Sequence, residues 1–497
     1  MKVGRTLLTA TTSYGSAFSL VLTGLLTIRL ATRGLGAEAF GAWSYVFSTI
    51  GFFFLFDLGL PSAMARIFGE PMASRNGREV GRWSAMCVLL MAGQAVLMLA
   101  AGWFLRDWVL GFSNVTGPLR EEMVGLWNAL LWIRVLSHPA SVLPALLFAQ
   151  NRVYVQNIIY AVSGWLSVAG FYLAMEWWKL GLMAYAVSVG VSITSTVLMW
   201  VWAVWRGPVR IPLTFRKLPW SGLPKALKFS SSVFVSQLAV QATALTQNVI
   251  IAAVLGLEAA AIFAVTSRLP AFLATFAFRP FAAFAPRWQE AFCRPETRDS
   301  WKGEYLQMLR FSGLFAAAAA TGLVAANLPF VAWWTKPEFA AFPLVNVLLA
   351  GGVILTVYIN CSITVFHNHY QLGGMAMMRA MAAVVEIGLG FFFAHSIGLT
   401  GIPLAMIIPN LFVLVYAYRS AGRLMGERLF LRILRDAVVW VPGLATATIA
   451  GFFGIPGAWL PDPFGKFAAG CFLGGLLALP AFFVAGQILW RLKHPVP

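Results

Sequence analysis

The chain is poor in charge, above all in acidic charge, and poor in cysteine. Only 11% of its 497 residues are charged, and 18 aspartates and glutamates stand against 36 lysines and arginines. The four cysteines lie far apart with no C-x-x-C spacing, which excludes a disulfide scaffold and leaves them as small packing residues. No G-x-x-x-x-G-K-[ST] phosphate loop occurs, so direct use of ATP by this chain is not expected.

Hydrophobic residues are abundant instead. They make up 60% of the chain and give a mean hydropathy of +0.78, which is typical of a membrane protein. A helix needs about 20 apolar residues to cross a hydrocarbon core of ~30 Å. Ten stretches reach that length without a charged residue, namely Thr6–Ile28, Trp83–Leu105, Val153–Met175, Leu180–Trp205, Phe229–Leu257, Phe311–Thr335, Phe339–Phe366, Ser396–Tyr418, Ala437–Leu460 and Phe467–Trp490. Four more carry an ionisable residue, namely Ala39–Ala65, Met123–Gln150, Ala259–Phe278 and Ala380–Ala394.

These stretches predict an all-α polytopic membrane protein with about 14 transmembrane helices, because they are too long and continuous for barrel strands. Twelve helices remain an alternative, since the short stretches around Arg268 and Glu386 and the final pair give the weakest signals. Most lysines and arginines fall in connections on the side of both termini, which predicts that both termini are cytoplasmic. Their dispersion over short loops favours membrane lipids as partners and speaks against nucleic acid.

The gaps between the stretches are short. None is longer than Arg279–Arg310, so there is no room for a soluble catalytic domain. A membrane glycosyltransferase or O-antigen ligase needs a sizeable external loop with catalytic residues, and these gaps exclude one. His367 and His369 have no local carboxylate or cysteine partner, so neither a metal site nor a cofactor is expected. Function must lie among the helices, and we expect a transporter rather than an enzyme.

An internal repeat divides the chain. A shift of 220 residues aligns Leu35-Gly36-Ala37-Glu38-Ala39 with Leu255-Gly256-Leu257-Glu258-Ala259, and a shift of 218 aligns Phe148 with Phe366. Both matches place equivalent connections on the same side of the membrane, as in parallel repeats. The repeat predicts an N-terminal six-helix lobe at 1–210, a basic cytoplasmic linker at 211–228, a C-terminal six-helix lobe at 229–424, and appended helices 13 and 14 with a cytoplasmic tail at 425–497.

Two segments carry a family resemblance. The first reads Arg29-Leu-Ala-Thr-Arg-Gly-Leu-Gly-Ala-Glu-Ala-Phe-Gly-Ala-Trp-Ser-Tyr and continues to Phe56-Asp57-Leu58-Gly59-Leu60; the second runs from Leu255 through Ser267-Arg268-Leu269 to Pro286. They resemble the polysaccharide and O-antigen flippases of the multidrug/oligosaccharidyl-lipid/polysaccharide (MOP) exporter superfamily. As organisation the resemblance covers residues 5–425. It implies a two-lobed, V-shaped transporter in which a polyprenyl-pyrophosphate-linked glycan moves through a central cavity.

Ionisable residues at bilayer depth are the first functional candidates, because each costs at least about 2.5–3.5 kcal/mol on insertion scales. Arg268 and Arg134 are candidates for binding pyrophosphate or an acidic sugar, since a guanidinium matches phosphate geometry. The alternatives are an ion pair with Glu386 or Asp57 for Arg268, and a position at the membrane interface for Arg134. Arg29 lies at the place of an arginine in similar lipid II flippases, but it is near enough to the helix end to snorkel.

Two acids and one histidine complete the candidate set. Glu386 is either a proton-coupling carboxylate or the partner of an arginine. Asp57 is a second candidate for ion coupling or charge pairing, and we expect it to fix the end of its helix. His138 stands beside Pro139 in an irregular helix, and broken helices line binding sites or act as hinges in transporters.

The sequence thus predicts a flippase of the bacterial inner membrane that moves a polyprenyl-pyrophosphate-linked oligosaccharide, a polysaccharide or O-antigen precursor, by alternating access. Polysaccharide polymerase and assembly proteins are the candidate protein partners. The alternative is a multidrug/cation antiporter of the same superfamily, driven by H⁺ or Na⁺. Because its substrates are cations, an antiporter needs acidic groups in its cavity, and the candidates here are mostly basic.

Overall fold

The computed structural model describes residues 2–57, 60–150, 152–220, 223–293, 301–369, 372–452 and 462–493. Within these ranges all regular structure is helical, and eleven stretches are long and apolar enough to cross a membrane. Three of the eleven, Pro118–Ala149, Leu257–Phe281 and Gly373–Met425, extend over two successive α-helices. The predicted all-α polytopic fold is therefore confirmed, and about 14 membrane helices fit it.

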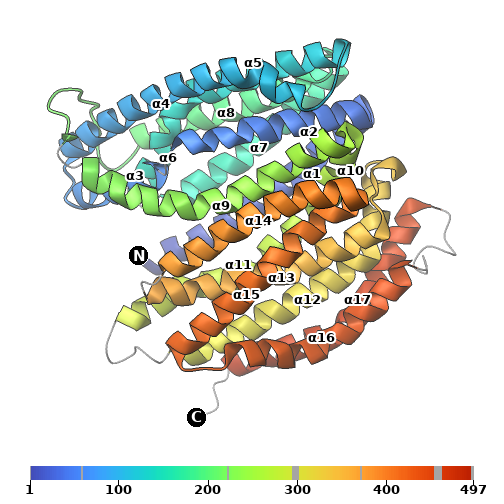
Figure 1. The fold of residues 1–497 in the computed structure, drawn as a ribbon. Coiled ribbons are helices and arrows are strands. Elements are labelled where there is room, and N and C mark those ends of the chain that lie inside the picture. Colours follow the sequence, from blue (N-terminus) through green and yellow to red (C-terminus); the bar gives the residue numbers. More distant parts are fainter. Residues whose placement is uncertain are drawn as a thin grey trace. The chain divides into compact units, whose positions relative to one another are not determined.

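The helices form two compact units, Met1–Leu257 and Glu258–Pro497. The first unit, blue to green in Figure 1, contains α1 (Lys2–Leu35), α2 (Ala37–Gly51), the 3₁₀ turn η1 (Phe52–Asp57), α3 (Leu60–Ala73), α4 (Gly77–Gly111), α5 (Pro118–Ser137), η2 (His138–Ser141), α6 (Val142–Ala149), α7 (Val153–Glu176), α8 (Met183–Trp205) and α9 (Leu223–Leu255). The first unit extends one helix beyond the lobe expected at 1–210, because α9 packs against α2, α3 and η1.

The second unit contains α10 (Leu257–Thr266), α11 (Arg268–Cys293), α12 (Trp301–Trp334), η5 (Pro337–Phe339), α13 (Pro343–Asn368), α14 (Leu372–Ile397), η6 (Gly398–Thr400), α15 (Gly401–Met425), α16 (Leu429–Phe452) and α17 (Pro463–Lys493). Helix α12 is its centre and packs against α11, α13, α16 and α17. Large aromatic side chains fill the core around it, and Trp301, Tyr305, Tyr358 and Tyr418 are almost completely buried.

The aligned halves of the repeat share an unusual connection. Gly36 lies between α1 and α2 with φ +80°, and Gly256 lies between α9 and α10 with φ +92°. Side chains with a Cβ rarely adopt this conformation, so glycine lets both helix pairs turn without strain. Trp43 and Phe263, which the repeat also aligns, are both buried. The two segments therefore have the same local structure.

The last helix is joined to the second unit through small residues. A Cβ on Gly470 would lie 2.5 Å from the Ala325 carbonyl oxygen, and one on Gly474 would lie 2.8 Å from the Gly322 Cα. This Gly-x-x-x-Gly spacing brings the backbones of α12 and α17 together, as small-residue motifs do in membranes. The stacked rings of Trp333 and Phe467 close one end of the contact, with centroids 5.8 Å apart.

Candidate functional site

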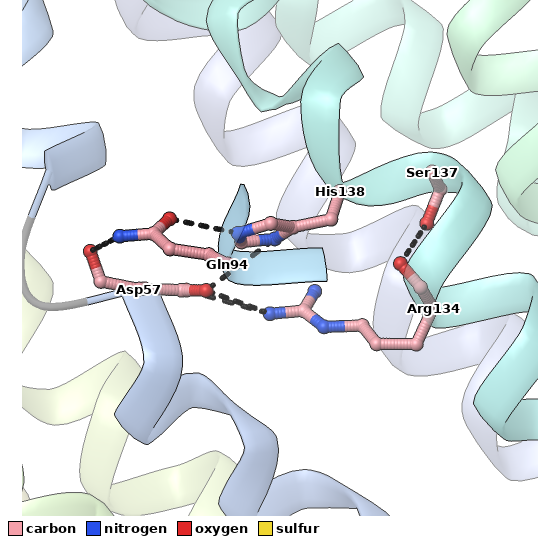
Figure 2. Close-up of polar contacts among 5 residues, drawn as sticks. All are labelled: Asp57, Gln94, Arg134, Ser137 and His138. Carbon is pink, nitrogen blue, oxygen red and sulfur yellow. Dashed lines mark hydrogen bonds and ion pairs between the residues drawn. The ribbon is translucent and has the colours of Figure 1, made fainter. Parts of the chain in front are cut away.

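Four polar side chains meet in the interior of the first unit. Asp57 ends η1, Gln94 lies halfway along α4, Arg134 is in the last turn of α5, and His138 begins η2. Figure 2 shows the Arg134 and His138 side chains directed at the Asp57 carboxylate, with Gln94 beside them. Three of these residues were candidates from the sequence. The structure brings them into one site.

Breaks in two helices place the polar groups at the same level. Pro139 lacks an N–H and clashes with the preceding turn, so the helix that starts at Pro118 tightens into η2 before it resumes as α6. The helix that starts at Ala37 likewise gives way to η1, and α3 follows from Leu60. Both 3₁₀ turns pack against α4. Asp57 therefore lies at the end of η1, between two helical segments.

An ion pair connects α5 to η1. Arg134 Nη2 lies 3.3 Å from Asp57 Oδ1 and 3.4 Å from Asp57 Oδ2. The Arg134 side chain is 35% exposed and that of Asp57 is 23% exposed, so neither group is fully buried. The positive charge of Arg134 is consequently shared with a carboxylate, and it is less available to an anionic substrate than the sequence suggested.

His138 is fully buried, and its partners decide where its proton lies. Gln94 Nε2 points at the Asp57 backbone oxygen at 3.5 Å, so Gln94 Oε1 faces His138 Nε2 at 3.0 Å. Because Oε1 is an acceptor, Nε2 must be the protonated ring nitrogen. That leaves the lone pair of Nδ1 facing Asp57 Oδ1 at 3.5 Å, and Nδ1 makes no hydrogen bond.

Two acceptors face each other across this gap, and a single proton between them turns repulsion into attraction. With the proton bound, either the imidazole is a cation or the carboxyl is neutral. Without it, the Asp57 carboxylate depends on Arg134 alone. A proton shared between His138 Nδ1 and Asp57 Oδ1 would therefore change the partners of Asp57.

A second buried acid lies in the other unit. Glu386 on α14 is 7% exposed, and Asn410 on α15 donates from Nδ2 to Glu386 Oε2 at 3.3 Å. The same amide nitrogen donates to the Met406 backbone oxygen at 2.8 Å, which fixes the amide orientation. The carboxylate therefore faces a donor on the neighbouring helix. Both roles predicted for Glu386, proton coupling and charge pairing, stay predictions.

Arg268 follows the break between α10 and α11, which buried hydrogen bonds stabilise. It is the first residue of α11 and is exposed. Two residues earlier, the Thr266 hydroxyl donates to the Phe339 backbone oxygen at 3.2 Å and the Thr266 carbonyl accepts from Asn327 at 3.1 Å. These bonds satisfy the backbone where α10 ends. Arg29 lies on α1, partly exposed, six residues before its end.

Gln94 was missed by the sequence analysis. It is the only amide side chain in the charge-free stretch Trp83–Leu105, and that was the available signal. An uncharged amide in an apolar helix is too common to single out until its partners are known. Among the described residues, no group of three or more histidines, cysteines or acids is placed to hold a metal ion.

Comparisons with known proteins agree with this architecture. Residues 15–173 match the MatE family. No curated protein sequence matches the chain. The structure is similar to an inward-closed lipid II flippase MurJ, with a TM-score of 0.71 and 13% identity over 98% of this chain and 100% of that one.

Two MATE transporters are similar as well. An inward-facing MATE family transporter of the MOP superfamily gives a TM-score of 0.69 and 14% identity, over 82% of this chain and 95% of that one. A variant of the Vibrio cholerae MATE transporter VcmN gives 0.61 and 14%, over 86% and 99%. The chain is thus a multi-pass membrane protein with the fold of MOP-superfamily transporters.

Proposed function

We propose that the protein is a flippase for a polyprenyl-pyrophosphate-linked oligosaccharide, a polysaccharide or O-antigen precursor, and that it makes and breaks no covalent bond. The observation that carries this proposal is the extent of the structural likeness. The lipid II flippase covers 98% of this chain, whereas the multidrug transporter of similar TM-score covers 82%. The surplus of 18 positive charges also suits an anionic lipid-linked substrate better than a cationic drug.

The site around Asp57 supplies a coupling step in this proposal. Loading a proton between His138 Nδ1 and Asp57 Oδ1 neutralises one charge, and it releases Arg134 from its only carboxylate partner among the described residues. The freed guanidinium then takes a phosphate oxygen, since it has donors but no other counter-ion. Proton release restores the Asp57–Arg134 pair and expels the anion. Binding of substrate and proton is thereby linked.

Arg268 and Arg29 are the further contacts that we propose for the pyrophosphate. Arg268 is exposed at the start of α11 and Arg29 is partly exposed on α1, so neither guanidinium is buried in a core. The two phosphate groups of a pyrophosphate carry more charge than one arginine balances, so more than one cation is required for a stable complex. We place the protein in the bacterial inner membrane with cytoplasmic termini, next to polymerase and assembly proteins.

A cation/H⁺ antiporter is the second candidate. It is favoured by the MatE match over residues 15–173 and by Asp57, a partly exposed acid at the centre of the matched unit. In that case Asp57 exchanges a proton for a cationic substrate, and Arg134 only orients the carboxylate. The two candidates differ in the sign of the substrate, which makes them separable.

Reconstituted proteoliposomes test the proposal. A fluorescent polyprenyl-pyrophosphate oligosaccharide is placed in one leaflet, and flipping is measured as the fraction of its fluorescence that a chemical quencher no longer reaches. Transport of a cationic dye is measured in parallel. We expect glycolipid flipping that is accelerated by a proton gradient whose acidic side faces the leaflet from which the substrate is taken, because proton and substrate bind together. His138→Gln should keep flipping but lose the acceleration, because glutamine preserves bulk and polarity without binding a proton. Arg134→Ala and Arg268→Ala should each lower the flipping rate.

Arg106→Ala is the matched control. Arg106 pairs with Asp107 at 3.1 Å near the end of α4, so its loss removes an arginine without touching the candidate site. Unchanged flipping in this variant is required. Dye transport with no glycolipid movement would instead identify the antiporter, and unaltered proton acceleration in His138→Gln would exclude the Asp57–His138 site from coupling under either function.

A further inference from the structure

A cavity of about 470 Å³ opens at the beginning of α4, away from the site described above. It is lined by Asn76, Arg78, Glu79, Arg82, Trp83, Lys217 and Pro219, and we call it the basic cup. Three of its side chains are cations and one is an acid. Arg78 and Arg82 are one helical turn apart on α4, and Lys217 comes from the connection 206–220 between α8 and α9, the strap.

The one acid of the cup is already engaged. Glu79 Oε2 accepts a hydrogen bond from Asn76 Nδ2 at 3.0 Å, and Asn76 Oδ1 accepts from the Glu79 backbone N–H at 3.2 Å. This reciprocal arrangement caps the first turn of α4. Within the part of the chain that the structure describes, no ion pair is found for Arg78, Arg82 or Lys217. The cup thus holds three cations and one carboxylate, and none of the three cations forms an ion pair among the described residues.

The strap is fixed by packing against the first unit. Val209 and Ile211 pack against the buried core of the first unit, and Trp83 packs against the same core. Two glycines on α4 make room for the strap. A Cβ on Gly77 would meet the Arg210 carbonyl oxygen at 2.0 Å, and one on Gly81 would meet the Pro212 carbonyl oxygen at 1.9 Å. The glycine stripe carries the strap, and the adjacent arginine stripe faces the cup.

The strap also carries apolar side chains that the protein leaves uncovered. Leu213 is 57% exposed, Phe215 is 54% exposed and Trp220 is 53% exposed. Arg216 and Lys217, which are exposed too, lie between Phe215 and Trp220 in the sequence. Exposed aromatic and aliphatic residues beside cations are typical of a segment that lies in the membrane interface. The charge-free part of α4 begins at Trp83, directly after Arg82, so we expect the cup to lie at the level of the lipid head groups.

We propose that the basic cup is a binding site for the phosphate of an anionic membrane lipid. Two guanidinium groups and an ammonium match phosphate oxygens in charge and donor geometry. Trp83 gives the cup an apolar wall, and the exposed apolar side chains of the strap offer a surface for the acyl chains. The site is separate from the proposed transport path, so it does not depend on which substrate is moved.

The full-length protein in neutral detergent, titrated with dioctanoyl phosphatidylglycerol and observed by native mass spectrometry, tests this. We expect a bound lipid that the zwitterionic phosphatidylcholine analogue does not replace. Removing Lys217 should weaken binding about fivefold, and the double change Arg78→Ala with Arg82→Ala about 30-fold. Arg216→Ala is the matched control, because Arg216 is an exposed strap cation that does not line the cup. It should leave binding unchanged.

Gly81→Leu distinguishes a binding site that depends on the position of the strap from attraction by surface charge alone. It retains every cation but forces the strap off α4, so we expect loss of lipid binding with unchanged net charge. Equal weakening by Arg216→Ala and Lys217→Ala would mean non-specific attraction and would overturn the proposal. So would displacement of the lipid by millimolar inorganic phosphate, which would identify a free-anion site. If Gly81→Leu does not fold, the comparison of Lys217→Ala with Arg216→Ala still distinguishes a specific site from non-specific attraction.

Discussion

Replacing Arg134 with methionine removes the guanidinium from beside the Asp57 carboxylate and keeps the apolar part of the side chain. Breaking a fully buried ion pair by removing one partner costs about 3–5 kcal/mol, whereas exposed pairs contribute ~0.2–1 kcal/mol. The two side chains here are 35% and 23% exposed, so the pair lies between these limits. We expect Arg134→Met to lower the free energy of unfolding by about 1–2 kcal/mol at neutral pH.

Replacing Asp57 tests whether the unpaired carboxylate causes the loss of stability. In an Asp57→Asn background no carboxylate remains to be stranded, so Arg134→Met should then cost only a few tenths of that amount. Acidic pH should also rescue the single variant, because a proton shared by His138 Nδ1 and Asp57 Oδ1 removes the unpaired negative charge. The sign is fixed: stability of Arg134→Met relative to the unchanged protein rises as the pH falls.

Unfolding by sodium dodecyl sulfate in mixed micelles, followed by tryptophan fluorescence, gives the four free energies of this cycle at two pH values. Arg106→Met serves as the control, since Arg106 pairs with Asp107, whose side chain is 66% exposed. The reasoning would be refuted by an Arg134→Met loss that is the same with aspartate and asparagine at position 57. A loss that does not vary with pH would refute the role of His138 while leaving the ion pair intact.

Three further changes test the fold. Gly474→Leu places a side chain against the backbone of α12 and should lower the melting temperature and expose α17 to protease, whereas Gly475→Leu, with nothing within 4 Å of its Cβ, should change neither. Asn327→Leu removes the donor to the Thr266 carbonyl and should cost about 1–3 kcal/mol of unfolding free energy in micelles; an unchanged value would show that the α10–α11 break needs no such support. Gly256→Ala, at φ +92°, should destabilise by about 1–3 kcal/mol, and a neutral effect would contradict the assigned connection.

The bilayer as solvent explains how much of the fold could be predicted from the sequence. In a bilayer each spanning segment must satisfy its own backbone, so an apolar run of sufficient length determines a helix without reference to the rest of the chain. Composition and run length therefore predicted the all-α polytopic fold and about 14 helices. The repeat around Gly36 and Gly256 was also readable, because a connection that requires glycine leaves that residue in the sequence.

The sequence could not show which faces of those helices meet. An apolar membrane helix has no polar and apolar side from which to infer its neighbours, since the lipid is as apolar as the core. That η1 and η2 both pack against α4, and so bring Asp57, Arg134 and His138 together around Gln94, was decided by tertiary packing alone. The same holds for the strap, which lies on α4 because Gly77 and Gly81 leave space for it.

The sequence by itself thus determined the helical class, the membrane character and the set of candidate charged residues, because each depends on local composition and on the cost of placing charge in hydrocarbon. Only the tertiary structure decided how those charges are paired. Arg134 was a candidate for an anionic substrate, and the structure gives it a carboxylate partner and places a proton-binding gap beside that partner. Pairing depends on contacts between residues 77 and 81 positions apart along the chain, which no local pattern records.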